Sequence, residues 1–212
     1  MEYRIDSKKV RINEGNLKLL GSGIEGNVYK YRDYALKIKS TNNLGLSYED
    51  AKYMIGTRTN KILLPKGILY INNRYSGYVT KYVSSIGNYK LIDLTKEELI
   101  NTVILPIEED ILSISSKNIL INDLKEEDTI INELGLYILD PGSFTIMRDI
   151  DEEDIKKLNI LQVKELIDMI VNLELKRNKL NNLLDDNIGD ILSDYYESVL
   201  PKNVSIKEYV KK

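Results

Sequence analysis

The sequence predicts an α+β fold, with strands concentrated in its first part and helices in its second part. Short apolar runs bounded by turn residues follow one another up to residue 83, which is typical of antiparallel strands. From residue 95 onward, apolar residues recur at helical spacing instead. The chain has 212 residues, 42% of them hydrophobic, which suffices for one domain or two small lobes. Residues 84–88 are small and polar and suit a crossing between the lobes.

Composition restricts the chemistry that the chain can perform. It contains no His, Cys or Trp, which excludes a His base, a Cys nucleophile, a Cys/His zinc site and disulfides. Carboxylates, Lys, hydroxyls and oxygen-bound metals remain. The net charge is −3 and no apolar run reaches roughly 18 residues, so we expect no nucleic-acid and no membrane partner. Residues 1–6 lack the apolar segment of a signal peptide, which favours a cytoplasmic location.

Sequence patterns in the first part of the chain predict one short helix and several strands. Residues 3–12 alternate loosely and suit an edge strand, and residues 47–55 read as the helix. Asn72-Asn73 is a good turn between the last two strands. The remaining strand-like runs lie at residues 17–23, 27–31, 34–38, 62–70 and 75–83.

The second part predicts helices with one buried face each. Thr95-Lys96-Glu97-Glu98 is a capping box, and Pro106 suits the first position of a following helix. Residues 151–154 are acidic and suit the start of a longer helix. The apolar stripes that we assign to core are Ile107, Ile111 and Ile114; Val163, Leu166, Ile167, Ile170 and Val171; and Ile188, Ile191, Leu192, Tyr195 and Val199, ended by Pro201.

A glycine-rich run joins the first two predicted strands. Residues 21–28 read Gly-Ser-Gly-Ile-Glu-Gly-Asn-Val, a complete G-x-G-x-x-G-x-V pattern, so that Gly21, Ser22, Gly23, Gly26 and Val28 are candidate site residues. Glycines let backbone N–H groups approach phosphate oxygens that a Cβ would block. A dinucleotide-binding unit needs a helix directly after the glycines, but a strand follows here, which rules out that interpretation.

One lysine lies on the strand next to this loop. Alternation places Ala35 and Lys37 on one face and Leu36 and Ile38 on the other. Lys37 follows the third loop glycine, Gly26, by 11 residues, so it could reach beneath the loop. The loop and the lysine together are more specific than either alone.

Three aspartates surround a predicted hairpin in the second part. Residues 129–131 and 136–139 read as short strands around a turn, with Asp128 entering the hairpin and Asp140 leaving it. Asp123 precedes them on the same loop. One carboxylate that takes a hydroxyl proton and two that hold magnesium are what phosphoryl transfer requires.

These three motifs together resemble the protein kinase superfamily over residues 15–145. Gly21–Val28 with Ala35-x-Lys37 is similar to its amino-terminal lobe, Asp123-Leu124-Lys125-x-x-Asp128 to its catalytic loop H-R-D-L-K-x-x-N, and Asp140-Pro141-Gly142 to its D-F-G. The resemblance implies a two-lobed protein kinase-like fold. Residues 1–83 would be an antiparallel five-stranded lobe with one helix, and residues 84–212 a minimal helical lobe.

The resemblance also implies ATP as the nucleotide and magnesium (Mg2+), or manganese (Mn2+), as the metal. The glycine loop would cover the nucleotide, Val28 and Ala35 would enclose the adenine, and Lys37 would pair with its phosphates. The backbone at Thr80–Val83, including Lys81 and Val83, would bind the adenine edge. Glu49 would pair with Lys37 from the short helix, with its neighbour Asp50 as the alternative.

The same resemblance assigns the chemistry to the second part of the chain. Asp140 and Asp128 would hold the metal, Asp123 would orient the acceptor hydroxyl and take its proton, and Lys125 would neutralise the moving phosphoryl group. A competing register takes Asn118-Ile119-Leu120 as the end of the catalytic loop. It would place Ser113 at the position of the catalytic aspartate.

Departures from the family pattern leave three functions open. Ile121-Asn122 replaces the H-R pair, Pro141 replaces Phe, and the activation segment after Gly142 is short or missing. The chain is then an active kinase for protein Ser/Thr or for itself, a small-molecule kinase of related fold, or a nucleotide-binding pseudokinase that regulates a partner protein. The acceptor, protein or small molecule, stays unknown at this point.

Overall fold

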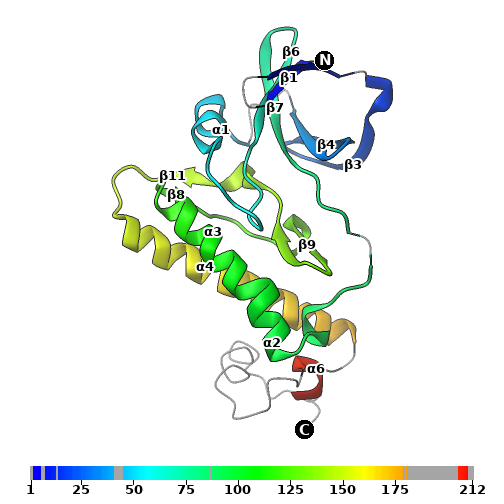
Figure 1. Cartoon of the computed structure of the whole chain (residues 1–212), viewed down its shortest axis with the longest axis vertical. Helices are drawn as coiled ribbons and strands as arrows, with labels where there is room; N and C mark the ends of the chain where they lie inside the picture. Colours follow the sequence, from blue (N-terminus) through cyan, green and yellow to red (C-terminus); the bar gives the residue numbers. More distant parts are fainter. Residues whose placement is uncertain are drawn as a thin grey trace.

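The computed structural model describes residues 2–5, 8–12, 14–40, 45–85, 87–178, 180 and 205–209. These residues form a sheet lobe and a helical lobe, joined by the chain that leaves strand β7 (Figure 1). The sheet has seven antiparallel strands in the order β2-β1-β6-β7-β5-β4-β3. Their bounds are β1 (Glu2–Ile5), β2 (Lys8–Arg11), β3 (Lys18–Gly23), β4 (Gly26–Tyr31), β5 (Tyr34–Lys39), β6 (Gly67–Ile71) and β7 (Arg74–Lys81).

The predicted five-stranded sheet is confirmed as β3-β4-β5-β7-β6, and the hairpin β1–β2 extends it at the β6 edge. Residues 3–12 therefore supply two strands rather than one. The strand predicted at residues 62–70 begins only at Gly67, because the segment before it pairs with the helical lobe instead. Leu63 N donates to Ile138 O (2.8 Å), and Ile138 N donates to Lys61 O (2.9 Å).

The predicted short helix is α1 (Tyr48–Met54). Its first turn is capped by Ser47, whose hydroxyl accepts the backbone N–H of Asp50 (3.1 Å). Ala51 and Met54 are fully buried and pack into the main core. The opposite face of the helix points to solvent, which leaves its acidic first turn exposed at Glu49.

The helical lobe contains two principal helices that lie side by side, α3 and α4 (Figure 1). The predicted capping box at Thr95 is confirmed, and the two helices expected at residues 95 and 106 are continuous through a π-helical segment. The helices are α2 (Lys96–Leu99), the π-helical segment (Ile100–Ile104), α3 (Leu105–Ser115), α4 (Glu152–Arg177) and α6 (Ile206–Tyr209).

Short strands and 3-10 turns connect the longer elements. The strands are β8 (Ile119–Leu120), β9 (Thr129–Asn132), β10 (Gly135–Ile138) and β11 (Thr145–Ile146), with β8 paired to β11 and β9 to β10. The 3-10 turns are Glu14–Asn16, Leu91–Asp93, Glu126–Asp128 and Pro141–Ser143.

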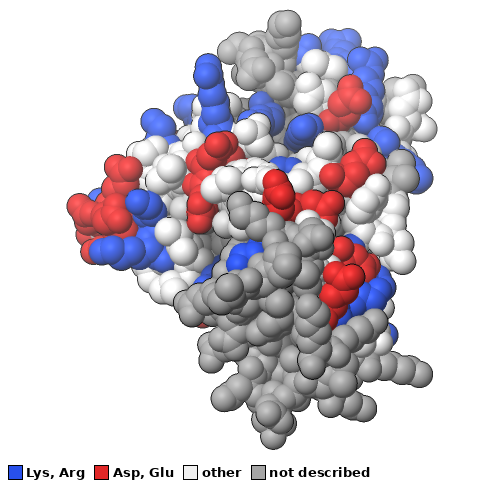
Figure 2. All heavy atoms as spheres, turned by 60° about the horizontal axis from the view of Figure 1, so that its bottom comes forward, with Lys and Arg blue, Asp and Glu red and all other residues white. Residues whose placement is uncertain are grey.

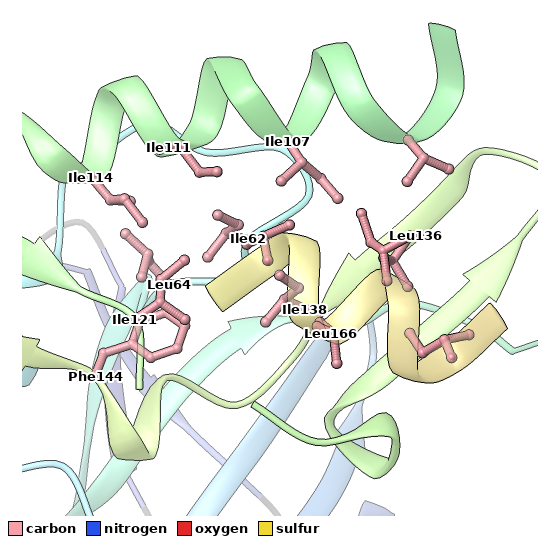
Figure 3. Packing of buried hydrophobic residues seen from close by; sticks show 14 of the residues in the cluster. Ile62, Leu64, Ile107, Ile111, Ile114, Ile121, Leu136, Ile138, Phe144 and Leu166 are labelled. Carbon is pink, nitrogen blue, oxygen red and sulfur yellow. The ribbon is translucent and has the colours of Figure 1, made fainter. Parts of the chain in front are cut away.

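One continuous hydrophobic core joins the two lobes (Figure 3). The predicted stripe of α3 faces side chains of the segment before β6, of β10 and of α4, and the predicted stripe of α4 from Val163 to Val171 is buried as well. The apolar stripe predicted at residues 188–199 lies outside the described residues. The side chains labelled in Figure 3 are Ile62, Leu64, Ile107, Ile111, Ile114, Ile121, Leu136, Ile138, Phe144 and Leu166.

A buried carboxylate ties α3 to the segment that precedes β6. Asp110 is 2% exposed and accepts the backbone N–H groups of Asn60 (2.9 Å), Lys61 (2.5 Å) and Ile62 (2.8 Å). Hydrogen bonds to a charged group are worth roughly 1.5–3 kcal/mol each. Asp110 therefore fixes the position of the segment before β6 relative to α3.

Acidic and basic residues are interspersed on the face shown in Figure 2. Among the described helices, none is both long enough and apolar enough to cross a membrane.

Glu174, near the end of α4, is a second buried carboxylate. Its Oε2 accepts the backbone N–H of Ile92 (3.1 Å), and the residue is 7% exposed. Burial raises the pKa of Glu174 to about 7; the charge of Asp93 adds to this, while Lys90 opposes it. The folded protein thus holds this proton more tightly than the unfolded chain, and the associated stability is lost as pH rises from the ordinary value of 4.5 through about 7.

We predict that Glu174→Gln stabilises the protein at pH 8 and leaves it unchanged near pH 4.5. The amide stays neutral and still accepts from Ile92, so the gain at pH 8 is roughly 1–2 kcal/mol. Urea unfolding at both pH values measures it. Glu165→Gln, at an exposed position of the same helix, is the control and stays within about 0.5 kcal/mol at both. Equal stability of Glu174→Gln and the unaltered chain at pH 8 would contradict the prediction.

Candidate functional site

A cavity of about 360 Å³ lies between the sheet and the hairpin β9–β10. Apolar side chains that the sequence analysis did not single out complete its walls, among them Leu20, Leu63, Ile130 and Leu139. The cavity brings together eight of the predicted site residues from five separate segments. These are Gly21, Val28, Ala35, Lys37, Lys81, Val83, Asp128 and Asp140.

The glycine-rich run is the tight hairpin between β3 and β4, closed by Ile24 and Glu25. Its glycines have different tasks. Gly26 has φ +150°, and a Cβ there would lie 2.0 Å from Ile38 O, so the packing of β4 on β5 requires glycine. A Cβ at Gly21 or Gly23 would meet nothing within 4 Å, so these two leave open space beside their backbone.

Lys37 connects the sheet lobe to the helical lobe. Its Nζ lies 2.5 Å from Asp140 Oδ2 and 3.0 Å from Glu25 Oε2, and its side chain is only 13% exposed. Burial alone would lower the pKa of Lys37, but the charge of Asp140 and the hydrogen bonds to Asp140 and Glu25 outweigh it, so its pKa is raised. Lys37 is therefore a fixed cation at the back of the cavity.

The carboxylate of Asp140 is held from several sides. Its Oδ1 accepts the phenol of Tyr78 on β7 (2.8 Å) and the backbone N–H of Gly142 (2.9 Å), while Oδ2 accepts from Lys37. Burial acts to raise the pKa of Asp140, yet Lys37 and these donors hold it below its ordinary value. Asp140 is therefore an anion held in a defined orientation.

Asp128 faces the same cavity from the 3-10 turn before β9. Burial raises its pKa, and the charge of Asp140 raises it further. Asp128 and Asp140 are thus two carboxylates that repel each other in a partly buried site. Such a pair suits a hard divalent cation, because magnesium is commonly held by one or two carboxylates together with substrate phosphates. Within the described residues, no three acidic side chains come close enough to form a complete metal site by themselves.

Asp123 and Lys125 lie on the loop between β8 and β9, and neither of these predicted catalytic residues lines the cavity. Asp123 has φ +50°, and its Oδ2 accepts from Lys125 Nζ at 3.0 Å. Their side chains are 69% and 54% exposed. A non-glycine residue at positive φ stores backbone strain, which is common at functional sites.

A buried asparagine of α4 fixes the start of this loop. Asn159 is fully buried, its Oδ1 accepts Ile121 N (2.7 Å), and its amide donates to Ile119 O (2.9 Å) and to the hydroxyl of Ser115 (3.0 Å). One side chain thus joins α4, α3 and β8 directly before Asp123. Ile121 itself contributes a buried side chain to the core.

The structure does not favour the alternative register. Ser113 lies inside α3, where its hydroxyl donates to Glu109 O (3.1 Å). Asn118 lies in the turn before β8, and its side chain donates to Met147 O (3.1 Å). Neither residue lines the cavity; in the other register Asp123 does not line it either, whereas Asp128 does.

The expected ion pair between Glu49 and Lys37 is not formed, and this prediction is corrected. Glu49 is exposed in the first turn of α1, and the alternative Asp50 hydrogen-bonds with Ser47. Lys37 pairs with Glu25 instead. Ser22 and Gly23 lie on β3 and Gly26 begins β4, outside the cavity wall.

Sequence reasoning missed Glu25, Tyr78 and Asn159. Two of them carried a signal. Asn159 lies four residues before Val163, so it is a polar residue on an otherwise apolar helix face, and Tyr78 alternates with Thr80 on the same side of its strand. Glu25 carried none, because the reach of a loop side chain depends on tertiary packing.

Comparisons with known proteins add little at the level of sequence. No family model and no curated protein sequence matches the chain. Among solved structures, it is similar to the kinase PK-1 of Cydia pomonella granulovirus, with a TM-score of 0.45 and 18% identity. The alignment covers 63% of this chain and 54% of the viral one, so the chain spans about half the length of that kinase.

The chain has a protein kinase-like fold, as its own topology indicates. The strand order β3-β4-β5-β7-β6, with α1 between β5 and β6, forms the first lobe. In the second lobe, a loop with Asp123 and Asp128 leads into the hairpin β9–β10 and on to Asp140.

We predict that Asn159→Ala destabilises the protein by roughly 2 kcal/mol, because it leaves the buried N–H of Ile121 without its acceptor. For a chain of this size that lowers the melting temperature by about 4–8 °C. Calorimetry measures the shift, and amide exchange should show faster exchange at Ile121. The matched control is Asn172→Ala on the same helix, because Asn172 Oδ1 has no hydrogen-bond partner among the described residues. Equal effects of the two substitutions would contradict the anchoring role.

Proposed function

We propose that the chain is an ATP-dependent kinase that transfers the γ-phosphoryl group to a hydroxyl group, with protein Ser or Thr, its own included, as the first acceptor to test. The observation that carries this proposal is the convergence of Lys37, Asp140 and Asp128 on one cavity beneath an open glycine hairpin. A cation and two carboxylates in one place complement the charges of a nucleoside triphosphate and its bound metal.

The nucleotide would enter with its adenine between apolar walls. Val28 and Ala35 from the sheet, with Ile130 and Leu139 from the hairpin, supply apolar surface on opposite sides of the cavity. Lys81 and Val83 line the cavity, and their backbone groups would bind the edge of the adenine ring. The open space beside Gly21 and Gly23 lets backbone N–H groups approach phosphate oxygens.

The phosphates would lie toward Lys37 and the two carboxylates. Lys37 would neutralise phosphate charge, and Asp128 with Asp140 would hold magnesium, which supplies charge stabilisation for the transferring phosphoryl group. The Tyr78 phenol and the Gly142 N–H keep one oxygen of Asp140 in place while the other faces Lys37. The mutual repulsion of Asp128 and Asp140 falls when a cation binds between them.

The acceptor hydroxyl would bind at the exposed side of the loop, at Asp123. As its oxygen forms the new bond to phosphorus and the bond to the ADP oxygen breaks, its proton passes to the Asp123 carboxylate. Lys125, already 3.0 Å from Asp123, places a positive charge where negative charge moves. The exposure of both side chains leaves room for a macromolecular acceptor.

A small-molecule acceptor is the second candidate, because the segment after Gly142 is short. Residues 143–151, nine in all, separate Gly142 from the first residue of α4, Glu152, and they include β11. That leaves little surface on which to align a peptide. A panel of small alcohols assayed for ATP consumption separates this candidate from the first.

We predict that Lys37→Met and Asp140→Asn each lower phosphate transfer from γ-labelled ATP by about 100- to 1,000-fold, because each removes a charge that stabilises the transferring group. Asp123→Asn lowers it by about 100-fold or more through loss of the proton acceptor. Incorporation into the chain itself and into a generic protein substrate is measured. Asp33→Asn, in the exposed turn between β4 and β5, is the matched control and keeps full activity.

Two outcomes would contradict the proposal. Transfer that survives Asp123→Asn would show that another group accepts the proton. Tight nucleotide binding with no transfer to any protein or alcohol would identify a pseudokinase that binds nucleotide and regulates a partner protein.

A further inference from the structure

The glycine hairpin supplies a carboxylate to Lys37. The Oε2 atom of Glu25, at the tip of the hairpin, lies 3.0 Å from Nζ of Lys37. Lys37 is the residue that the proposed function assigns to the phosphates. We propose that Glu25 is the positioning residue of Lys37 and replaces the helix carboxylate expected at Glu49. This inference rests on the proposed function for its catalytic consequence and on the ion pair alone for its structural one.

A backbone hydrogen bond fixes the position of Glu25. The Glu25 carbonyl accepts the N–H of Ser40 (2.7 Å), directly after β5 ends. This bond continues the pairing of β4 with β5 around the hairpin tip. The side chain therefore starts from a defined point opposite Ser40, which lies three residues after Lys37 in the chain.

The carboxylate occupies a niche that two glycines leave open. A Cβ at Gly142 would lie 2.7 Å from Glu25 Oε2, and a Cβ at Gly45, shortly before α1, would lie 2.9 Å from the same atom. The carboxylate therefore sits between the turn of Asp140 and the entry to α1. A helix glutamate that paired with Lys37 would have to approach the same ammonium group.

Helix α1 offers no carboxylate for this task. Its buried face carries Ala51 and Met54, which pack into the core, while Glu49 is exposed. Lys37 is 13% exposed and Glu25 is 36% exposed, so the pair is more shielded from water than a surface ion pair. Removal of Glu25 would leave Asp140 as the sole carboxylate bonded to Lys37 among the described residues.

The two carboxylates, Asp140 and Glu25, would therefore have different roles at the Lys37 ammonium group. Asp140 is the residue proposed to turn toward a metal, and Glu25 can then keep Lys37 aligned with the nucleotide. Because Glu25 belongs to the glycine hairpin, the position of that hairpin and the orientation of Lys37 depend on each other. A shift of the hairpin away from β5 would release the lysine.

The first test needs no nucleotide. Thermal unfolding is compared for Glu25→Gln, Lys37→Met and the double variant, with Glu97→Gln, at an exposed position of α2, as the control. We expect Glu25→Gln to lower the melting temperature by about 2–4 °C in the original chain and by less than about 1 °C in the Lys37→Met background. The control lowers it equally little in both backgrounds. An additive double variant would overturn the ion pair.

The second test measures ATP turnover as kcat and KM separately. We expect Glu25→Gln to lower kcat about tenfold or more with little rise in the KM for ATP, since a negative charge near the phosphates is lost at the same time. Glu97→Gln leaves both constants unchanged. A rise in kcat would mean that Glu25 blocks the site, and a loss on Glu49→Gln but not on Glu25→Gln would restore the helix glutamate; either result overturns the proposal.

The two tests keep the inference separate from the function on which it rests. If the unaltered chain shows no turnover while the unfolding cycle is non-additive, the proposed kinase activity fails and the pairing of Glu25 with Lys37 stands. If turnover is present and the cycle is additive, the kinase proposal stands and the role of Glu25 fails.

Discussion

The ion pair between Lys37 and Asp140 links two segments that lie 103 residues apart, one in each lobe. It forms only if β5 presents Lys37 on the cavity side and if the hairpin β9–β10 delivers Asp140 opposite to it. Isolated surface ion pairs are worth little, but this one is largely shielded, and Asp140 accepts additional bonds from Tyr78 and Gly142. The cavity between the lobes takes its polar character from this pair.

Two buried polar side chains give the ion pair a stable frame. Asp110 of α3 gathers the backbone of residues 60–62, which in turn pairs with β10 directly before Asp140. Asn159 of α4 holds the strand and loop that lead to Asp123. Each of these side chains satisfies several backbone groups, so the loops that carry the aspartates are anchored to the helices.

Much of the arrangement could be predicted, because it rests on local patterns. Alternation on β5 placed Lys37 on the same face as Ala35, and the turn residues around Asn132–Gly135 predicted the hairpin that carries Asp128 and Asp140 toward the cavity. The buried stripe on α4 followed from helical spacing alone. These features depend on local periods of two or 3.6 residues, which can be recognised without knowledge of the tertiary contacts.

The features that were missed depend on packing between distant segments. Glu49 has the family's residue type and a suitable helix, but α1 turns it to solvent, and nothing in the sequence shows how far Glu25 reaches around Gly45 and Gly142. The early start predicted for β6 failed for a similar reason, since residues 61–63 are strand-like but pair with β10. Local propensity cannot tell which neighbour an apolar segment will choose.

The measurement that tests the central claim most directly is a calorimetric titration of the full chain with ATP, with and without magnesium. If Lys37, Asp128 and Asp140 form a nucleotide and metal site, ATP binds and its affinity rises markedly when magnesium is present. Absence of binding up to millimolar ATP, or binding that magnesium does not change, would contradict the account and leave a kinase-like scaffold with another task.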